Sequence, residues 1–233
     1  MLLLAKGKLE INTNQNIRVG IYGGAFDPIH IGHVEPIIEI TNRHRLNKIH
    51  FIPTNISSES KKIKATPEQR LLMMQEAIGK TKNFIIDDRE IRRGGKSYTC
   101  DTVKEIKKEY PSEVQLYCII GYDLLDSIHS WKSFEDILQL SNILVVRREG
   151  FNNHSATDKV LSLLTANQSV FHNESCGKIF IEDTSAINVT SRDIRYRLKN
   201  NLSISGLVNL DLEKWLHKNK TVSYTHLTLP TKA

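Results

Sequence analysis

The chain has 233 residues, of which 39% are hydrophobic and 25% are charged. This composition is that of a soluble globular protein and excludes a disordered or collagen-like chain as the main state. The 32 lysines and arginines exceed the 26 aspartates and glutamates to give a net charge of +6. Because these basic residues are scattered, the excess fits anionic small ligands as well as it fits nucleic acid.

Two further classes of protein are disfavoured by the composition. No run approaches the roughly 18 to 20 apolar residues that a membrane-spanning helix needs, and the leucines that open the chain are too few for a signal peptide. The 3 cysteines, Cys100, Cys118 and Cys176, are far apart and have neither CxxC nor CxxH spacing. We therefore expect a cytoplasmic protein with reduced thiols, without a disulfide framework and without a metal site of its own.

Short β-branched runs alternate with longer amphipathic segments along the chain, a pattern typical of a parallel sheet covered by helices. Strands are expected at residues 18–22, 48–53, 84–88, 114–121, 142–147 and 178–182. Helices are expected at residues 34–45, 67–79, 99–109, 134–140, 157–165, 191–199 and 210–218. The predicted fold class is α/β: a Rossmann-like, doubly wound, mainly parallel sheet with a helical C-terminal part.

The domain organisation is expected to be simple, because the chain shows no internal repeat, linker or break in composition. A single domain is predicted over residues 17–218. Residues 1–16 form an N-terminal extension, and residues 222–233 are interpreted as a disordered or non-native tail. The polar, lysine-rich segment 55–66 is predicted to be a mobile loop at the carboxyl end of the second strand, which is the ligand-binding edge of such a sheet.

The most informative segment runs from Gly20 to His33 and reads GIYGGAFDPIHIGH. The adjacent Gly23 and Gly24 let the backbone approach an anion closely, and the helix that follows offers its N-terminus to negative charge. His30 and His33 are three residues apart, so both imidazoles lie on one face of the first turn and can donate to the same phosphate chain. The segment fits neither the Walker A pattern nor GxGxxG, which disfavours the usual kinases, GTPases and dehydrogenases.

A second segment with phosphate-binding chemistry lies near the end of the predicted fold and reads VTSRDIR, residues 189–195. Thr190 and Ser191 can cap a helix and offer hydroxyl groups, while the guanidinium of Arg195, one turn later, can bind a phosphate with two donors. On its own, a capped surface helix would explain the same residues. The pairing with the first segment favours an anion-binding role.

These two segments carry a family resemblance. GGAFDPIHIGH resembles the signature of the nucleotidylyltransferase superfamily, and VTSRDIR is similar to the ISSTxIR segment of that superfamily, with Arg192 where a threonine is usual. The resemblance implies catalytic roles for His30, His33 and Arg195. It implies ATP binding by Gly23, Gly24, Ala25, Phe26, Gly32, Gly121, Asp123, Thr190 and Ser191.

Further segments are similar to those of bacterial nicotinate mononucleotide adenylyltransferases: SYT at residues 97–99, CIIGYDLL at 118–125, the tryptophan that follows at 131 and NILVVRREGF at 142–151. The likeness extends from about residue 18 to residue 218. It implies transfer of the adenylyl group from ATP, accompanied by Mg²⁺, to nicotinate mononucleotide, with release of pyrophosphate, in NAD biosynthesis. The expected substrate-binding residues are Asp27, Lys61, Lys62, Tyr98, Thr99 and Trp131.

These assignments also make chemical sense for the single residues. The Trp131 ring can stack on a pyridine ring, and Tyr98 and Thr99 at a loop-to-helix junction can bind a carboxylate. Asp123, which follows a strand and a glycine, can accept hydrogen bonds from ribose hydroxyls. One departure concerns the loop after the second strand, where the family commonly has PPH followed by Lys or Arg. This chain has ISSESKK at residues 56–62, so Lys61 or Lys62 is expected to supply the cation there.

Three alternatives remain open at this point. The same chemistry could use nicotinamide mononucleotide or phosphopantetheine as the acceptor, or a cytidylyl donor. Class I aminoacyl-tRNA synthetases share the His-x-Gly-His turn, but this chain has no KMSKS-like loop, so we do not expect nucleic acid as a partner. A membrane partner is not expected either, because no apolar run is long enough to span one. An inactive ATP-binding regulator is the third alternative. Whether the chain forms a homo-oligomer is left open.

Overall fold

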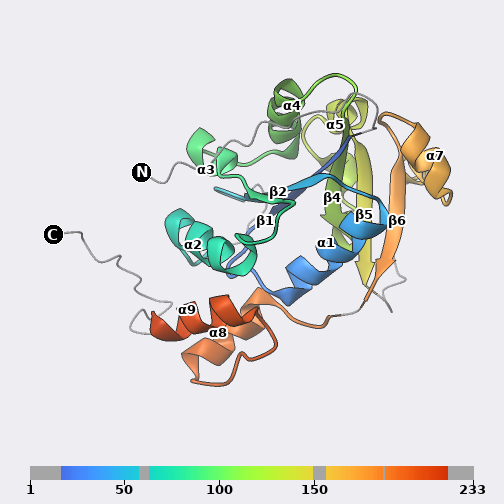
Figure 1. Cartoon of the computed structure of the whole chain (residues 1–233). Coiled ribbons are helices and arrows are strands. Elements are labelled where there is room, and N and C mark those ends of the chain that lie inside the picture. The colour runs from blue at the N-terminus through green and yellow to red at the C-terminus, as the bar shows by residue number, and fades with distance from the viewer. Residues whose placement is uncertain (1–16, 58–62, 149–155, 186, 220–233) are drawn as a thin grey trace.

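The computed structural model describes residues 17–57, 63–148, 156–185 and 187–219. These residues form a six-stranded sheet in the order β3-β2-β1-β4-β5-β6, and every neighbouring pair is parallel (Figure 1). The order is that of the doubly wound dinucleotide-binding sheet, which reverses its direction of winding between β1 and β4. The predicted α/β fold class is confirmed. The strands are β1 Arg18–Gly24, β2 Lys48–Pro53, β3 Phe84–Ile86, β4 Gln115–Gly121, β5 Asn142–Arg148 and β6 Ile179–Thr184.

Helices cover both faces of this sheet (Figure 1). Strand β4 shows the reason, because its side chains alternate between two apolar clusters: Tyr117 and Ile119 face one, and Cys118 and Ile120 face the other. The first face is covered by α1 (Ile31–Arg43), α2 (Pro67–Ile78), α7 (Gln168–Asn173), α8 (Ser191–Lys199) and α9 (Leu210–Lys218). The second is covered by α4 (Thr99–Glu109), α5 (Phe134–Leu140) and α6 (Asp158–Leu163).

The main differences between the structure and the predicted elements are in the bounds of one helix and one strand and in two additional short helices. Helix α1 begins at Ile31, three residues before the predicted start, because His30 takes the N-cap position. Helices α3 (Arg89–Arg93) and α7 were not predicted. The predicted strand 84–88 ends at Ile86, because Asp87 turns its carboxylate to Arg89, with an N–O distance of 2.5 Å.

The predicted segments at the ends of the chain lie outside the described residues. This applies to the extension 1–16, to the tail 222–233 and to residues 58–62 of the loop 55–66. The predicted domain limits of 17 and 218 stay a prediction. Among the helices that the structure describes, none combines the length and the apolar character that crossing a bilayer requires.

A buried polar network ties β4 to α7 and to the end of α1. The Tyr117 hydroxyl lies 2.9 Å from His172 Nδ1, and His172 Nε2 lies 3.2 Å from His44 Nδ1. His44 Nε2 lies 2.9 Å from Glu182 Oε2 in β6. Burial, together with the positive charge of Arg18 and the neighbouring His44, lowers the pKa of His172 to about 4. The network is therefore built around a neutral His172 imidazole.

We expect the free energy of unfolding to decrease as the pH falls from 6.5 toward about 4. In this window the unfolded chain, with an ordinary histidine pKa of 6.5, binds a proton that folded His172 accepts only near pH 4. The variant His172→Gln should reduce this pH dependence in urea titrations, whereas His129→Gln, at an exposed imidazole, should retain it. An unchanged slope in the His172 variant would contradict this origin.

Candidate functional site

The candidate site lies where the winding of the sheet reverses, at the carboxyl ends of β1 and β4. In open α/β sheets, ligands bind in the crevice at this point. Gly24 ends β1 and Gly121 ends β4, so the segments GGAFDPIHIGH and CIIGYDLL lie at the carboxyl ends of neighbouring strands. The connection between β1 and α1, residues 25–30, is called the β1–α1 connection below.

The β1–α1 connection has an unusual backbone. Phe26 has φ 47°, in the left-handed region, which costs a residue with a side chain about 1–2 kcal/mol. Its ring lies against Gly24, where a Cβ atom would be only 2.9 Å from Phe26 Cε1. The Phe26 ring also meets the His33 ring edge-on, with the ring centroids 5.3 Å apart. The glycine is therefore needed for the ring to fold back over the end of β1.

The two motif histidines lie together at the start of α1. Their rings are stacked with centroids 3.7 Å apart, and His30 is only 3% exposed. The backbone N–H of His30 donates to His33 Nδ1 at 3.3 Å. Because Nδ1 of His33 accepts, the proton of a neutral ring is on Nε2. The predicted one-face arrangement of the two imidazoles thus agrees with the geometry of the turn.

Gly32 keeps the stacked histidines close to the second motif. A Cβ atom at this position would lie 2.9 Å from Val189 Cγ1 and 3.2 Å from His30 Nδ1. Val189 is itself buried and precedes the cap of α8. The absence of a side chain at Gly32 therefore lets the His30 ring and Val189, which precedes α8, both pack closely against this position.

Helix α8 docks onto the β1–α1 connection through polar side chains. Ser191 Oγ donates to the carbonyl of Pro28 at 2.9 Å, and Arg195 Nη1 donates to the carbonyl of Asp27. Thr190 caps the helix, since its Oγ1 accepts from the backbone N–H of Asp193 at 3.0 Å. The two motifs predicted to bind ATP, which are more than 150 residues apart in the sequence, are thereby brought into direct contact.

Asp27 is buried in this junction, with 3% of its surface exposed. Its Oδ2 accepts from the backbone N–H of Lys64 at 2.7 Å, and its Oδ1 accepts from that of Ala65 at 3.0 Å. Arg195 Nη1 lies 3.5 Å from Asp27 Oδ2. The carboxylate predicted to bind substrate thus holds the end of the loop that leads into α2. The predicted cations of this loop, Lys61 and Lys62, lie outside the described residues.

The residues predicted to recognise the acceptor surround the start of α4. Tyr98 is the N-cap residue of this helix and Thr99 is its first residue. Trp131 follows the short helix η2 (Ile128–Ser130), and both aromatic rings are partly buried against the same apolar cluster. The Lys132 ammonium lies 4.4 Å from the centroid of the Tyr98 ring.

Two other contacts complete the same edge. The backbone N–H of Asn55 donates to Ser97 Oγ at 3.0 Å, and the N–H of Ser97 donates to the carbonyl of Ile56 at 2.9 Å. The segment before Tyr98 therefore lies alongside the chain that leaves β2. Beyond β4, Asp123 folds back over Gly121, where a Cβ atom would be 2.5 Å from Asp123 Oδ1, and Asp123 is exposed.

Sequence reasoning missed one buried charge beneath this site. Arg70 of α2 is 1% exposed, and its Nη1 donates to the carbonyl of Ala25 at 3.0 Å. A signal exists in hindsight, because Arg70 falls on the helical stripe that also carries the buried Met73 and Met74. An arginine on an apolar stripe must find an acceptor in the interior.

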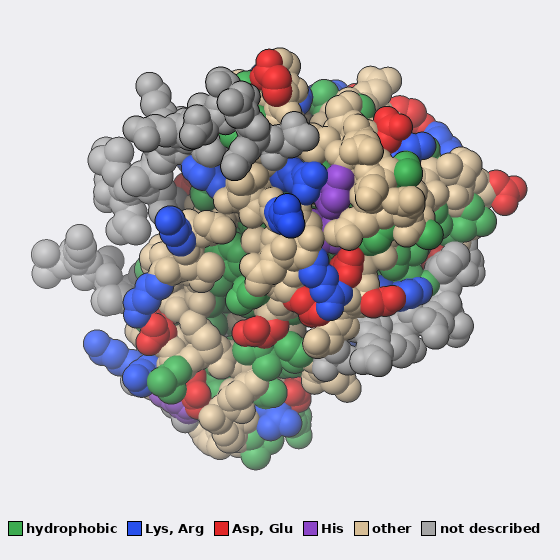
Figure 2. Space-filling model, turned by 45° about the vertical axis from the view of Figure 1, so that its right-hand side comes forward, with side chains coloured by type: hydrophobic (Ala, Val, Ile, Leu, Met, Phe, Trp, Pro, Cys, Tyr) green, Lys and Arg blue, Asp and Glu red, His purple; other side chains and the backbone are tan. Residues whose placement is uncertain are grey.

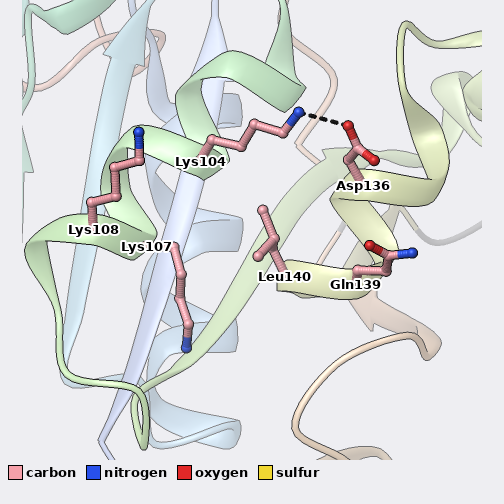
Figure 3. Close-up of a pocket in the computed structure, with 6 residues that line it drawn as sticks. All are labelled: Lys104, Lys107, Lys108, Asp136, Gln139 and Leu140. Atoms are coloured by element: carbon pink, nitrogen blue, oxygen red, sulfur yellow. Dashed lines mark hydrogen bonds and ion pairs between the residues drawn. The ribbon is translucent and has the colours of Figure 1, made fainter.

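The surface pocket shown in Figure 3 is separate from these residues. It has a volume of about 400 Å³ and lies between α4 and α5 (Figure 3). Two of its three lysines are already engaged: Lys104 pairs with Asp136 at 2.6 Å, and Lys107 donates to the carbonyl of Val114 at 2.9 Å. Because Val114 precedes β4, the pocket is near the amino end of that strand, and none of the described site residues lines it.

Charged side chains of both signs lie on the face drawn in Figure 2. Lysine and arginine side chains there are interspersed with aspartates and glutamates (Figure 2). This agrees with the scattered basic residues of the sequence.

Replacing Gly32 by alanine should lower turnover roughly 10- to 100-fold while the fold is retained, because the added methyl group displaces His30 or the start of α8. The measurement is steady-state kinetics alongside thermal unfolding. Glu35→Ala, on an exposed position of the same helix, is the matched control and should keep full turnover. Full turnover in Gly32→Ala would show that the close approach is not needed.

Comparisons with known proteins identify the family of this chain. The model of a family described as cytidylyltransferase-like matches residues 21–197. The "Probable nicotinate-nucleotide adenylyltransferase" of Shigella boydii serotype 4 is 34% identical over 192 residues, covering 81% of this chain and 90% of the relative. The protein with the same name in Psychromonas ingrahamii is 34% identical over 213 residues, covering 88% of this chain and 99% of the relative.

A solved structure has a similar fold at lower identity. It is the Plasmodium falciparum nicotinic acid mononucleotide adenylyltransferase complexed with NaAD, which has a TM-score of 0.66 and 19% sequence identity. The match covers 87% of this chain and 95% of that one. At this identity the likeness concerns the fold alone.

Proposed function

The chain belongs to the cytidylyltransferase-like family and, within it, to the nicotinate-nucleotide adenylyltransferases, and from this premise we propose how its residues carry out the reaction. The protein transfers the adenylyl group of ATP to nicotinate mononucleotide, giving nicotinate adenine dinucleotide and pyrophosphate in NAD biosynthesis. The observation that supports the residue assignment best is the contact of Ser191 and Arg195 with the backbone beside the stacked histidines.

The reaction needs alignment and charge stabilisation. A phosphate oxygen of nicotinate mononucleotide attacks the α-phosphorus of ATP, and the bond from that phosphorus to the oxygen bridging to the β-phosphate breaks. The attacking oxygen is already ionised at neutral pH, so no general base is required. We assign the stabilisation of the developing charge to His30, His33 and Arg195, which converge on one connection.

The remaining ATP contacts follow from the same arrangement. The backbone of the β1–α1 connection and the start of α8 would hold the phosphates, and the exposed Asp123 carboxylate would accept from ribose hydroxyls. The residues proposed to contact ATP are Gly23, Gly24, Ala25, Phe26, Gly32, Gly121, Asp123, Thr190 and Ser191.

We propose that Mg²⁺ is bound with ATP, through the phosphate oxygens and water that this ion prefers. The side chains fit this arrangement, because in the described ranges no three His, Cys, Asp or Glu side chains gather so that they could hold a metal ion. When bound, Mg²⁺ offsets negative charge on the triphosphate.

The acceptor is proposed to lie at the start of α4. Trp131 would stack on its pyridine ring, and Tyr98 and Thr99 would bind its carboxylate. Lys61, Lys62 and the buried Asp27 would act on the phosphate side of this substrate, Asp27 by holding the end of the loop that carries the two lysines. We also infer a cytoplasmic location, supported by the unpaired state of all three cysteines.

His33→Ala should lower turnover by about 10²–10³, the loss typical of removing one preorganised donor to a developing charge. Folding should be retained, since the His33 ring is partly exposed. His217→Ala, at an exposed imidazole of α9, is the matched control and should behave as the wild type. Pyrophosphate release is the measurement, and near-normal turnover in His33→Ala would remove this residue from the mechanism.

Pyrophosphate release with either nicotinate or nicotinamide mononucleotide as the sole acceptor tests the function itself. We expect the acid to be strongly preferred.

Trp131→Leu should raise the KM for the acceptor about tenfold or more, with the KM for ATP unchanged, because only the pyridine ring loses its stacking partner. Trp215→Leu, at the other tryptophan, should leave both KM values unchanged. Preference for the amide would overturn the acceptor assignment.

A further inference from the structure

Arg70 is a buried charge with incomplete bonding. It is the largest side chain in the described interior that is almost fully buried, at 1% exposed. Its Nη1 donates to the Ala25 carbonyl, but its Nε has no hydrogen-bond partner among the described residues. Burial lowers the pKa of Arg70, while the nearby negative charges of Asp27, Glu68 and Glu90 raise it.

This arrangement is a poor way to gain stability. A buried guanidinium is costly unless its donors are satisfied, and an apolar side chain of similar size is often at least as stabilising. Arg89, also buried at 6% exposed, illustrates the contrast, because its guanidinium pairs with Asp87 and with Glu109 at 3.1 Å. Among the residues that the structure describes, Arg70 has no comparable set of partners, so its charge is better explained by the backbone it holds.

The bond from Arg70 fixes the orientation of one peptide group. In a trans peptide the C=O and the following N–H point in opposite directions. The peptide from Ala25 to Phe26 is trans, since the structure has its cis bond at Asp27–Pro28. With the Ala25 carbonyl held toward Arg70, the N–H of Phe26 is directed away from α2. A left-handed φ is unfavourable for phenylalanine, so this orientation of the peptide group needs other interactions to hold it.

We propose that Arg70 is a positioning residue for adenylyl transfer, which holds the Ala25 carbonyl and thereby aims the Phe26 N–H at the ATP phosphates. The inference rests on the proposed function. Backbone N–H groups held in place before the reaction stabilise developing phosphate charge without reorganisation. The Phe26 N–H belongs to the same connection as His30 and lies next to the residue that Arg195 contacts. Arg70 would therefore act on ATP through the backbone alone.

Arg70→Met tests this role, because it keeps the approximate size of the side chain and removes its donors. We expect kcat to fall about 10- to 100-fold, the cost of slightly misplaced groups, with the KM for nicotinate mononucleotide changed less than about twofold. The melting temperature should fall by no more than about 5 °C. Arg70→Lys, which retains a charged donor, should have a kcat between those of Arg70→Met and the wild type.

Arg89→Met is the matched control for removing a buried arginine. It leaves the Asp87 carboxylate without its ion-pair partner, so we expect a clearly lower melting temperature. Its kcat, measured on folded protein, should stay within about threefold of the wild type. A purely structural arginine thus alters unfolding, whereas a positioning arginine alters kcat.

The outcomes decide between the two roles. A folded Arg70→Met variant that keeps at least about half of the wild-type kcat would overturn the proposal, as would a kcat in Arg70→Lys no higher than in Arg70→Met. If Arg70→Met fails to fold, folded Arg70→Lys decides alone: a kcat below about a third of the wild type supports the role, and a higher kcat overturns it. Wild-type protein that releases no pyrophosphate with nicotinate mononucleotide would instead overturn the proposed function.

Discussion

The arrangement of the site depends on one junction, where the backbone from Asp27 to Pro28 meets α8. Two carbonyls of this short segment accept from Ser191 and Arg195, and the Asp27 carboxylate accepts from the backbone that leads into α2. Three parts of the chain that are distant in sequence therefore share one anchor. Because the acceptors are buried, leaving any of them without a donor would cost more than the bond itself contributes.

The same junction holds in place the edge of the sheet at which the candidate site lies, although this edge consists of connections. A loop with a left-handed phenylalanine is unfavourable in isolation, and here it is held from both sides. Arg70 holds the Ala25 carbonyl from beneath, and the stacked imidazoles of His30 and His33 begin a helix directly after it. Catalysis by alignment of two polyanions requires this kind of order, because the gain comes from groups that do not move during the reaction.

The candidate site is identified by polar side chains that gather at one place and not by the pocket in the surface. The pocket in Figure 3 is lined by three lysines, and two of their ammonium groups are already bound, one to Asp136 and one to backbone carbonyls. At the carboxyl ends of β1 and β4, by contrast, imidazole, guanidinium and hydroxyl groups from different elements meet. The residues that approach each other there are those that a triphosphate would need.

The sequence by itself determined the six strands, their alternation with the longer helices and the identity of the motif residues, because strand periodicity, adjacent glycines and helix caps are local properties. Only the tertiary structure decided which partners these residues take. The Asp27 carboxylate binds backbone N–H groups nearly forty residues away, and Arg70 of α2 donates to the carbonyl of Ala25 in the β1–α1 connection. Such pairings are set by how the chain packs, since a hydrogen bond between distant segments leaves no pattern in either segment alone.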